Sequence, residues 1–203
     1  MIVSISLMRR RPDISLETFR AHWLDPHGRL TAKLPGTRHY VQNHVIDGPG
    51  TNEAARALAL DGFPALSFDS PEARQAAHHS PEMAACNVDS RAFVGAVSRV
   101  ITDDGGALPP SEPGLLKQVV LTLRGAALSD LASTPLHTRG LIAHRILEQA
   151  AAPNSTVPHH GIEVDAIHEI WVESEQDLIR NAAVLAHAGP GLATFQVQAH
   201  AFL

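Results

Sequence analysis

The fold is decided by residues 66–72, LSFDSPE, because a stretch of the same kind recurs in the second half of the chain. Residues 170–176, IWVESEQ, again place a mainly apolar run before an acidic residue and a serine. Serine is a preferred helix N-cap, and proline favours the first turn of a helix. Each copy therefore predicts a strand that ends and a helix that begins. A second pair of stretches, residues 38–41 and 139–142, aligns in the same register.

The first half of the chain follows the order strand, helix, strand, strand, helix, strand. Val3, Ile5 and Leu7 alternate with polar or longer residues, which indicates a strand with two different faces. Ser15 can cap a helix that continues to about Asp25. Further strands are expected at 38–46, 63–68 and 92–101, with a helix from residue 71 and a short one at 53–60.

The second half repeats this order. Strands are expected at 116–123, 139–147, 167–172 and 193–202, with helices at 129–136 and 173–187. This self-similarity predicts an α+β fold of two ferredoxin-like βαββαβ units, whose antiparallel sheets pack face to face as an α+β barrel. The domains are residues 1–102 and 115–203, joined by a linker at 103–114 that is rich in glycine, proline and acidic residues.

Composition limits the partners and the location. The chain has 203 residues and a formal net charge of −5, so nothing predicts a nucleic-acid interface. The apolar start reaches arginines 9–11 too early for a signal peptide or a membrane span, which indicates a cytoplasmic protein without membrane contact. Cys86 is the only cysteine, which excludes an intrachain disulfide, and its alanine neighbours indicate a packing role.

Polar and aromatic side chains are concentrated at residues 38–44. By the two-residue period of a strand, Tyr40, Gln42 and His44 share one face. The opposite face carries Val41 and Val45 and is expected to pack under helices, so the first set is expected to line the barrel lumen.

The face with Tyr40 and His44 suggests acid–base chemistry, and Ser6 on the first strand is expected to share it. His44 is a candidate for proton transfer because histidine titrates near neutral pH. Tyr40 can donate to a carbonyl or phenolate oxygen, which Gln42 and Asn43 can orient. The alternative is that these groups satisfy one another in a polar seam.

The preceding helix carries three more candidates. His22 and His27 lie about 140° apart around a helix axis, which is unfavourable for a shared metal, so no metal site is predicted, although with His44 they form a conceivable ligand set. The alternative for His22 and Trp23 is packing between helix and sheet, and for His27 a helix-end loop. Phosphate-binding glycine motifs are absent from the sequence, so nucleotide cofactors are not expected.

The combined motifs resemble the EthD family, named for ethyl tert-butyl ether degradation. The resemblance rests on Gly62 and on residues 3–12 (VSISLMRRRP), 15–28 (SLETFRAHWLDPHG), 35–36 (PG), 40–44 (YVQNH) and 66–70 (LSFDS). It covers roughly residues 1–102. The second half looks like a degenerate copy, because it lacks both the Gln-Asn-His and the His-Trp-x-x-x-His-Gly patterns.

The resemblance implies a dimeric α+β barrel, formed either by a homodimer or within one chain, with one competent pocket in the latter case. The positions that match the family's motif are His22, His27, Tyr40, Gln42, Asn43 and His44. Proton transfer is assigned to His44 or His27, and oxygen binding to Tyr40 with Gln42 or Asn43. His22, Trp23 and Ser6 are added as substrate contacts.

The implied function is a small-molecule enzyme of the monooxygenase or cyclase/dehydratase type. It would perform cofactor-independent oxygenation, or cyclisation and dehydration, of an aromatic or polyketide-like substrate in an apolar lumen. One alternative is a non-catalytic protein that holds a hydrophobic ligand or another polypeptide. A third is a haem-binding protein with His44 or His27 as axial ligand.

Overall fold

The computed structural model describes residues 1–126, 131, 134–150, 157–188 and 191–203. Its first half consists of β1 (Ile2–Arg10), α1 (Leu16–His22), η1 (Trp23–His27), α2 (Gly28–Thr31), β2 (Thr37–Val45), α3 (Glu53–Leu58), β3 (Gly62–Phe68), α4 (Pro71–His78), α5 (Pro81–Ser90) and β4 (Val94–Asp103). Its second half consists of β5 (Leu116–Leu123), β6 (Gly140–Ala150), β7 (Val164–Val172), α6 (Glu175–His187) and β8 (Leu192–Ala201). Every predicted strand is confirmed. The helix predicted at 129–136 includes residues outside those described.

The helices α1, α4 and α6 begin where the sequence predicts. The side chains of Ser15, Ser70 and Ser174 each accept a hydrogen bond from the backbone N–H three residues later, which satisfies a free donor of the first turn. The end predicted for the first helix was only partly right. The backbone leaves the helical region at Asp25, which precedes a cis proline, but helical geometry then resumes as far as Thr31.

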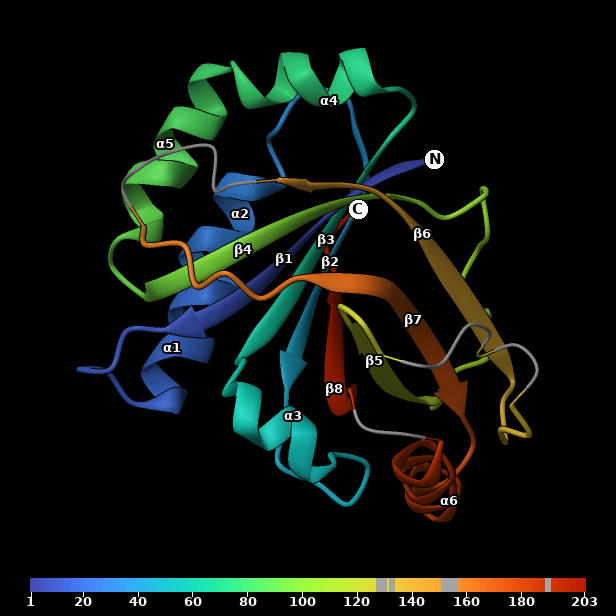
Figure 1. The fold of residues 1–203 in the computed structure, drawn as a ribbon. Helices are drawn as coiled ribbons and strands as arrows, with labels where there is room; N and C mark the ends of the chain where they lie inside the picture. Colours follow the sequence, from blue (N-terminus) through green and yellow to red (C-terminus); the bar gives the residue numbers. More distant parts are fainter. Residues whose placement is uncertain (127–130, 132–133, 151–156, 189–190) are drawn as a thin grey trace.

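The strands close into one antiparallel barrel in the order β1-β3-β2-β8-β5-β7-β6-β4. Two seams join the halves of the chain, since β2 pairs with β8 and β4 pairs with β6. A single chain therefore supplies the complete barrel. Figure 1 shows the first-half strands β1 to β4 beside one another and the second-half strands completing the ring.

The inward side chains of the barrel form its largest apolar cluster. Ile5 and Leu7 of β1, Phe63 of β3, Leu121 of β5 and Phe195 of β8 are at most 2% exposed within this cluster. Helix α3 packs against the same cluster and covers this end of the barrel. The opposite end is hollow.

Helices cover the outside of the barrel. Helices α1 and α5 lie over the first-half sheet, where Phe19, Trp23 and Phe93 form a second cluster, and α6 packs on the second-half sheet through Leu178 and Leu185 (Figure 1). Both faces of β2 are therefore largely buried from Tyr40 onward, whereas the outer face of β6 is exposed at Ala143, Arg145 and Leu147. Among the described residues, no helix has the length and apolarity needed to cross a membrane.

Candidate functional site

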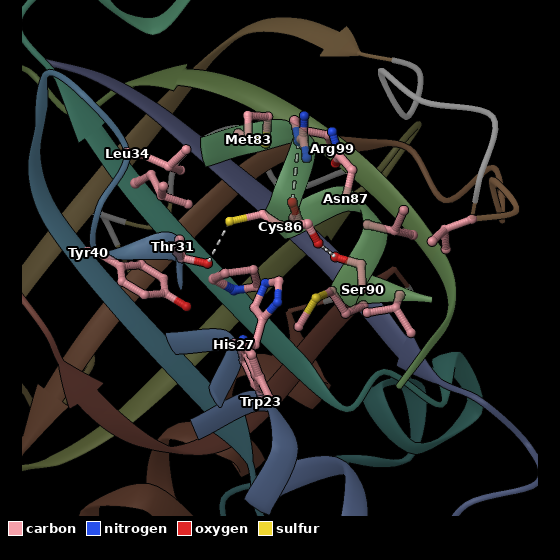
Figure 2. A pocket seen from close by; sticks show the side chains of 17 residues that line it. Trp23, His27, Thr31, Leu34, Tyr40, Met83, Cys86, Asn87, Ser90 and Arg99 are labelled. Carbon is pink, nitrogen blue, oxygen red and sulfur yellow. Dashed lines mark hydrogen bonds between the residues drawn. The ribbon is translucent and has the colours of Figure 1, made fainter. Parts of the chain in front are cut away.

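A pocket lies between the first-half sheet and the helical segments η1, α2 and α5, outside the barrel lumen (Figure 2). We call it the helix–sheet pocket. It has a volume of about 100 Å³ and is lined by Trp23, His27, Tyr40, Cys86 and Arg99 among others. Figure 2 shows Arg99 beside Met83 and Asn87, across the pocket from Trp23.

This position corrects one expectation from the sequence. Tyr40 and Ser6 line the helix–sheet pocket, whereas Val41 lines the lumen. The prediction that Tyr40, Gln42 and His44 face the lumen was therefore wrong. Its premise was that the apolar face of β2 packs under helices, but a closed barrel with outer helices buries both faces, so the apolar character of Val41 and Val45 does not identify the helix side.

His22 and His27, the two histidines of the His-Trp-x-x-x-His-Gly pattern, converge on one carboxylate. Asp89 of α5 accepts from His27 Nδ1 at 2.8 Å and lies 3.1 Å from His22 Nε2. The side chain of His27 is 11% exposed and that of His22 is 29% exposed. The break at Asp25 and the continued helix to Thr31 place His27 on the same side as His22, which a regular helix of that length does not.

Asp89 fixes the chemistry of His27. Because a carboxylate is an acceptor, Nδ1 carries the proton and Nε2 keeps a lone pair. Burial lowers the pKa of His27, and Asp89 opposes that effect. His27 is therefore a neutral imidazole at neutral pH, oriented by a carboxylate, which is the arrangement of a general base.

The remaining predicted residues of β2 form a chain of hydrogen bonds. His44 Nε2 donates to Gln42 Oε1 at 2.8 Å, and Gln42 Nε2 donates to Tyr40 Oη at 2.6 Å and to the Trp23 carbonyl at 2.7 Å. Gln42 is thereby held at both ends of its amide. This is the polar seam that the sequence left open as an alternative.

His44 lies behind Trp23, away from the helix–sheet pocket. Its ring stacks on that of Trp23 with centroids 4.1 Å apart and meets the ring of His200 edge-on at 4.8 Å. Burial, with added repulsion from His200 and Arg20, lowers the pKa of His44 to about 3. It is neutral at physiological pH, and its predicted role in proton transfer stays a prediction.

Tyr40 and Arg99 are two of the hydrogen-bond donors that line the helix–sheet pocket. Burial raises the pKa of Tyr40 to about 12, so its hydroxyl remains protonated. Burial and the charge of Arg74 lower the pKa of Arg99 to about 10, which still leaves it charged at pH 7. Arg99 reaches Ser6 Oγ at 3.4 Å, and its Nη1 is buried without a hydrogen-bond partner among the described residues.

Cys86 lies in the same pocket as a thiol. Its Sγ is 3.8 Å from Thr31 Oγ1, and burial raises the pKa of the thiol. A protonated, buried thiol is a weak nucleophile. This environment agrees with the predicted packing role.

Asn43 is the one predicted site residue of β2 that points into the barrel. Its Oδ1 accepts from Lys117 Nζ at 2.8 Å, and Lys117 also bonds Glu169 at 2.8 Å. The sequence analysis missed both charged residues. The signal was a single lysine within the apolar run LKQVVLTL of β5, since a buried lysine is rare unless it is paired.

No group of three or more metal-ligating side chains occurs in the described part of the chain. The helix–sheet pocket also does not fit a haem, because its volume of about 100 Å³ is far smaller than a porphyrin ring system. His27, the histidine that lines it, is held by Asp89. The residues of the helix–sheet pocket therefore give no support to His27 as a haem ligand.

Histidine burial predicts acid sensitivity. Burial lowers the pKa of His27, His44, His78, His160 and His200. Near pH 6.5 these histidines become protonated in the unfolded chain but stay neutral in the folded chain. Their contribution to the free energy of unfolding is therefore fully present above that pH and is lost as the pH decreases.

Because His44 is protonated only in the unfolded chain, we expect it alone to lower the free energy of unfolding by about 1.4 kcal/mol when the pH falls from about 7.5 to about 5.5. Urea denaturation at the two pH values measures this loss. His44→Phe should show a smaller pH dependence than the native chain; an unchanged dependence argues against a neutral His44.

Comparison with known proteins agrees with the fold and with the first-half motif. Over 98% of this chain, the fold is similar to an anthrone oxidase-like protein (10% identity, 92% of that chain, TM-score 0.54) and to a proposed monooxygenase from Lactobacillus acidophilus NCFM (8% identity, 93% of that chain, TM-score 0.52). An EthD family protein from Bacillus halodurans C-125 is 22% identical over 51% of this chain and 98% of its own, with a TM-score of 0.42. No curated protein matches the sequence. The EthD domain model matches residues 11–96, which lie within the first half of this chain.

Proposed function

We propose that the chain is a small-molecule enzyme that removes a proton from an enolisable or phenolic substrate in the helix–sheet pocket. The observation that carries the proposal is the His27–Asp89 pair, with a hydrogen bond of 2.8 Å, in a pocket that Arg99 also lines. His27, oriented by Asp89, supplies the base, and Arg99 supplies a charged donor for the substrate oxygen that becomes negative.

The roles divide among three side chains. Nε2 of His27 accepts the proton, and Asp89 stabilises the imidazolium that forms. Arg99 binds the developing enolate or phenolate oxygen, because its guanidinium is buried and its Nη1 is unused among the described residues. Tyr40 is protonated and can donate to the same oxygen.

Two reactions are open to the resulting anion. It can react with dioxygen as the oxidant, which is the monooxygenase type of chemistry, or attack a carbonyl of the same molecule with loss of water. Both fit the predicted cofactor-independent oxygenation or cyclisation and dehydration. The single observation of a base opposite a donor supports their shared first step.

Size restricts the substrate. A cavity of about 150 Å³ accommodates benzene, and the helix–sheet pocket measures about 100 Å³. An aromatic substrate therefore requires a side chain to move. Met83 and Leu34 are two of the flexible apolar residues of the lining.

We further infer that the chain is a tandem of two ferredoxin-like units, at residues 1–102 and 115–203. Two observations support this: the strand order reads β4-β1-β3-β2 and then β8-β5-β7-β6, and Arg38 pairs with Asp69 as Arg139 pairs with Glu173. A cytoplasmic location and a homodimer stay predictions.

The test uses anthrone, which enolises and consumes one dioxygen to give anthraquinone and water. We expect deuterium exchange at its acidic carbon, and oxygen uptake, to be faster with the protein than in buffer. Asp89→Asn or His27→Gln should lower the exchange rate by about 10²-fold, the usual contribution of a positioned base. His187→Gln, an exposed histidine outside the pocket, is the matched control.

Equal exchange rates for the native chain and for His27→Gln contradict the assignment of the base. Absence of exchange with anthrone and with a 1,3-dicarbonyl compound, despite saturable binding of either, supports the non-catalytic ligand-binding alternative instead.

A further inference from the structure

A second cavity occupies the hollow end of the barrel lumen. It has a volume of about 540 Å³, within the usual range for small-molecule sites. Its walls are mostly apolar and come from both halves of the chain: Val3, Val41, Ala65, Ile142, Trp171 and Ala199. We call it the lumen cavity.

Charged groups form its floor, next to the apolar cluster that fills the other end. Lys117 Nζ donates to Asn43 Oδ1 and to Glu169 Oε1, each at 2.8 Å, and lies 4.8 Å from the centroid of the Trp171 ring. The side chains of Lys117 and Glu169 are 6% and 12% exposed. Burial raises the pKa of Glu169, but Lys117 and His144 together outweigh that effect, so the carboxyl is ionised.

His144 leaves hydrogen-bonding capacity unused at this floor. Its Nδ1 lies 3.2 Å from Thr102 Oγ1, while its Nε2 is 4.0 Å from Glu169 Oε2, beyond hydrogen-bond distance. Nε2 is buried and has no hydrogen-bond partner among the described residues, and the residue lines the cavity. Buried polar atoms are nearly always bonded, so such an exception indicates a missing partner.

The architecture of the barrel does not require this cluster. Strand pairing aligns Ile2 with Phe68 in the first half and Leu116 with Val172 in the second, which makes Val3 and Ala65 the counterparts of Lys117 and Glu169. The first half thus builds the same sheet with apolar residues. A buried ion pair is also weak evidence for a stabilising role, since apolar replacements are often neutral.

We propose that the lumen cavity binds a neutral, mainly apolar small molecule with a hydroxyl group, such as a phenol or an alcohol. Because Thr102 Oγ1 donates to the Val3 carbonyl, Nδ1 of His144 donates to Thr102 and Nε2 keeps a lone pair. The ligand hydroxyl reaches the floor, where its proton lies between two acceptors, Glu169 Oε2 and Nε2 of His144. Lys117 and Glu169 cancel each other's charge, so the floor offers no counter-ion for a carboxylate or an ammonium. The apolar body lies against Trp171 and Ile142.

The mouth of the cavity suits such a ligand. Residues 107–111 of the segment that joins the two halves lie along it, as does Leu203. Leu108 and Leu203 are 70% and 50% exposed, which leaves apolar surface beside the entrance for the far end of a ligand to cover. The site is separate from the helix–sheet pocket and does not depend on its activity.

Isothermal titration calorimetry of the whole chain with 4-butylphenol tests the proposal. We expect saturable binding of one molecule per chain, and binding of 4-butylbenzoate at least about tenfold weaker. The chain has two tryptophans, Trp23 beside the helix–sheet pocket and Trp171 in the lumen cavity. Binding should therefore change fluorescence in Trp23→Phe, where Trp171 is the remaining tryptophan, and far less in Trp171→Phe.

Two variants locate the ligand. The double variant Lys117→Val/Glu169→Ala copies the first-half pattern, and we expect it to weaken 4-butylphenol binding at least about tenfold while binding of butylbenzene is kept. Ala199→Phe should weaken both ligands by filling the cavity. His27→Gln is the matched control and should bind as the native chain does.

No saturable binding of 4-butylphenol, or equal affinity in the folded double variant, overturns the proposal. Loss of binding in His27→Gln would assign the ligand to the helix–sheet pocket, which also overturns it.

Discussion

Replacement of Lys117 by methionine alone is expected to lower the free energy of unfolding by about 3–5 kcal/mol. The variant keeps the Glu169 carboxylate, whose side chain is 12% exposed, and removes the ammonium 2.8 Å from it. An uncompensated buried charge is costly, and Glu169 escapes the cost only by taking up a proton. Urea denaturation at pH 8 measures the loss.

The pH dependence separates this cause from a packing defect. In the native chain burial raises the pKa of Glu169, but Lys117 together with His144 depresses it from 4.5 to about 2. The pair therefore stabilises the fold above about pH 4.5 and loses that contribution as the pH falls toward 2. In Lys117→Met the pKa of Glu169 is raised instead, so the loss in free energy of unfolding relative to the native chain should shrink as the pH falls from 8 to 5.

A double variant Lys117→Val/Glu169→Ala should lie within about 2 kcal/mol of the native chain. Equal losses in the single and double variants would show that lost packing explains the effect.

Trp23→Ala is expected to cost about 3–5 kcal/mol. Trp23 is fully buried, stacks on His44 and packs against Phe19 with ring centroids 5.5 Å apart. Its removal also opens the wall of the helix–sheet pocket. The same denaturation experiment measures the cost, and a loss below about 1 kcal/mol would mean that the site collapses around the smaller side chain.

A glycine provides the matched control. A Cβ built on Gly62 would lie 2.2 Å from the Trp23 ring, so Gly62→Ala should destabilise the native chain by about 1–3 kcal/mol through overpacking. In the Trp23→Ala background the same substitution should cost much less, because the ring it meets is gone. Additive losses would contradict direct contact between the two positions.

The sequence predicted the strands and most helix starts, because period-two alternation and serine caps are local signals. The repeat register was informative too: its aligned stretches contain Ser70 and Ser174, which both cap helices, and Arg38 and Arg139, which form matching ion pairs. The EthD motif brought together His22 and His27, which meet at one carboxylate. These features depend on spacing along the chain.

The errors concern contacts between distant segments. Asp89 has no local feature that marks it as the partner of two histidines 62 and 67 residues away. The sequence analysis assigned the wrong side of β2 to the lumen. The strand is buried on both sides, so the polarity of its side chains does not distinguish the side that faces the helices from the side that faces the lumen. Lys117 and Glu169 were missed because the candidate site residues were taken from the family motif, which lies in the other half of the chain.

Closure of the barrel has a consequence for biosynthesis. Strand β2 receives its outer partner only when β8, residues 192–201, has been made, and β4 waits for β6. While the second half is still being translated, the first-half sheet has two unpaired edges and an uncovered apolar face. Exposed edges of this kind pair readily with other chains. Slow translation through the second half should therefore lower the yield of folded protein, and chaperones that shield nascent sheets should raise it.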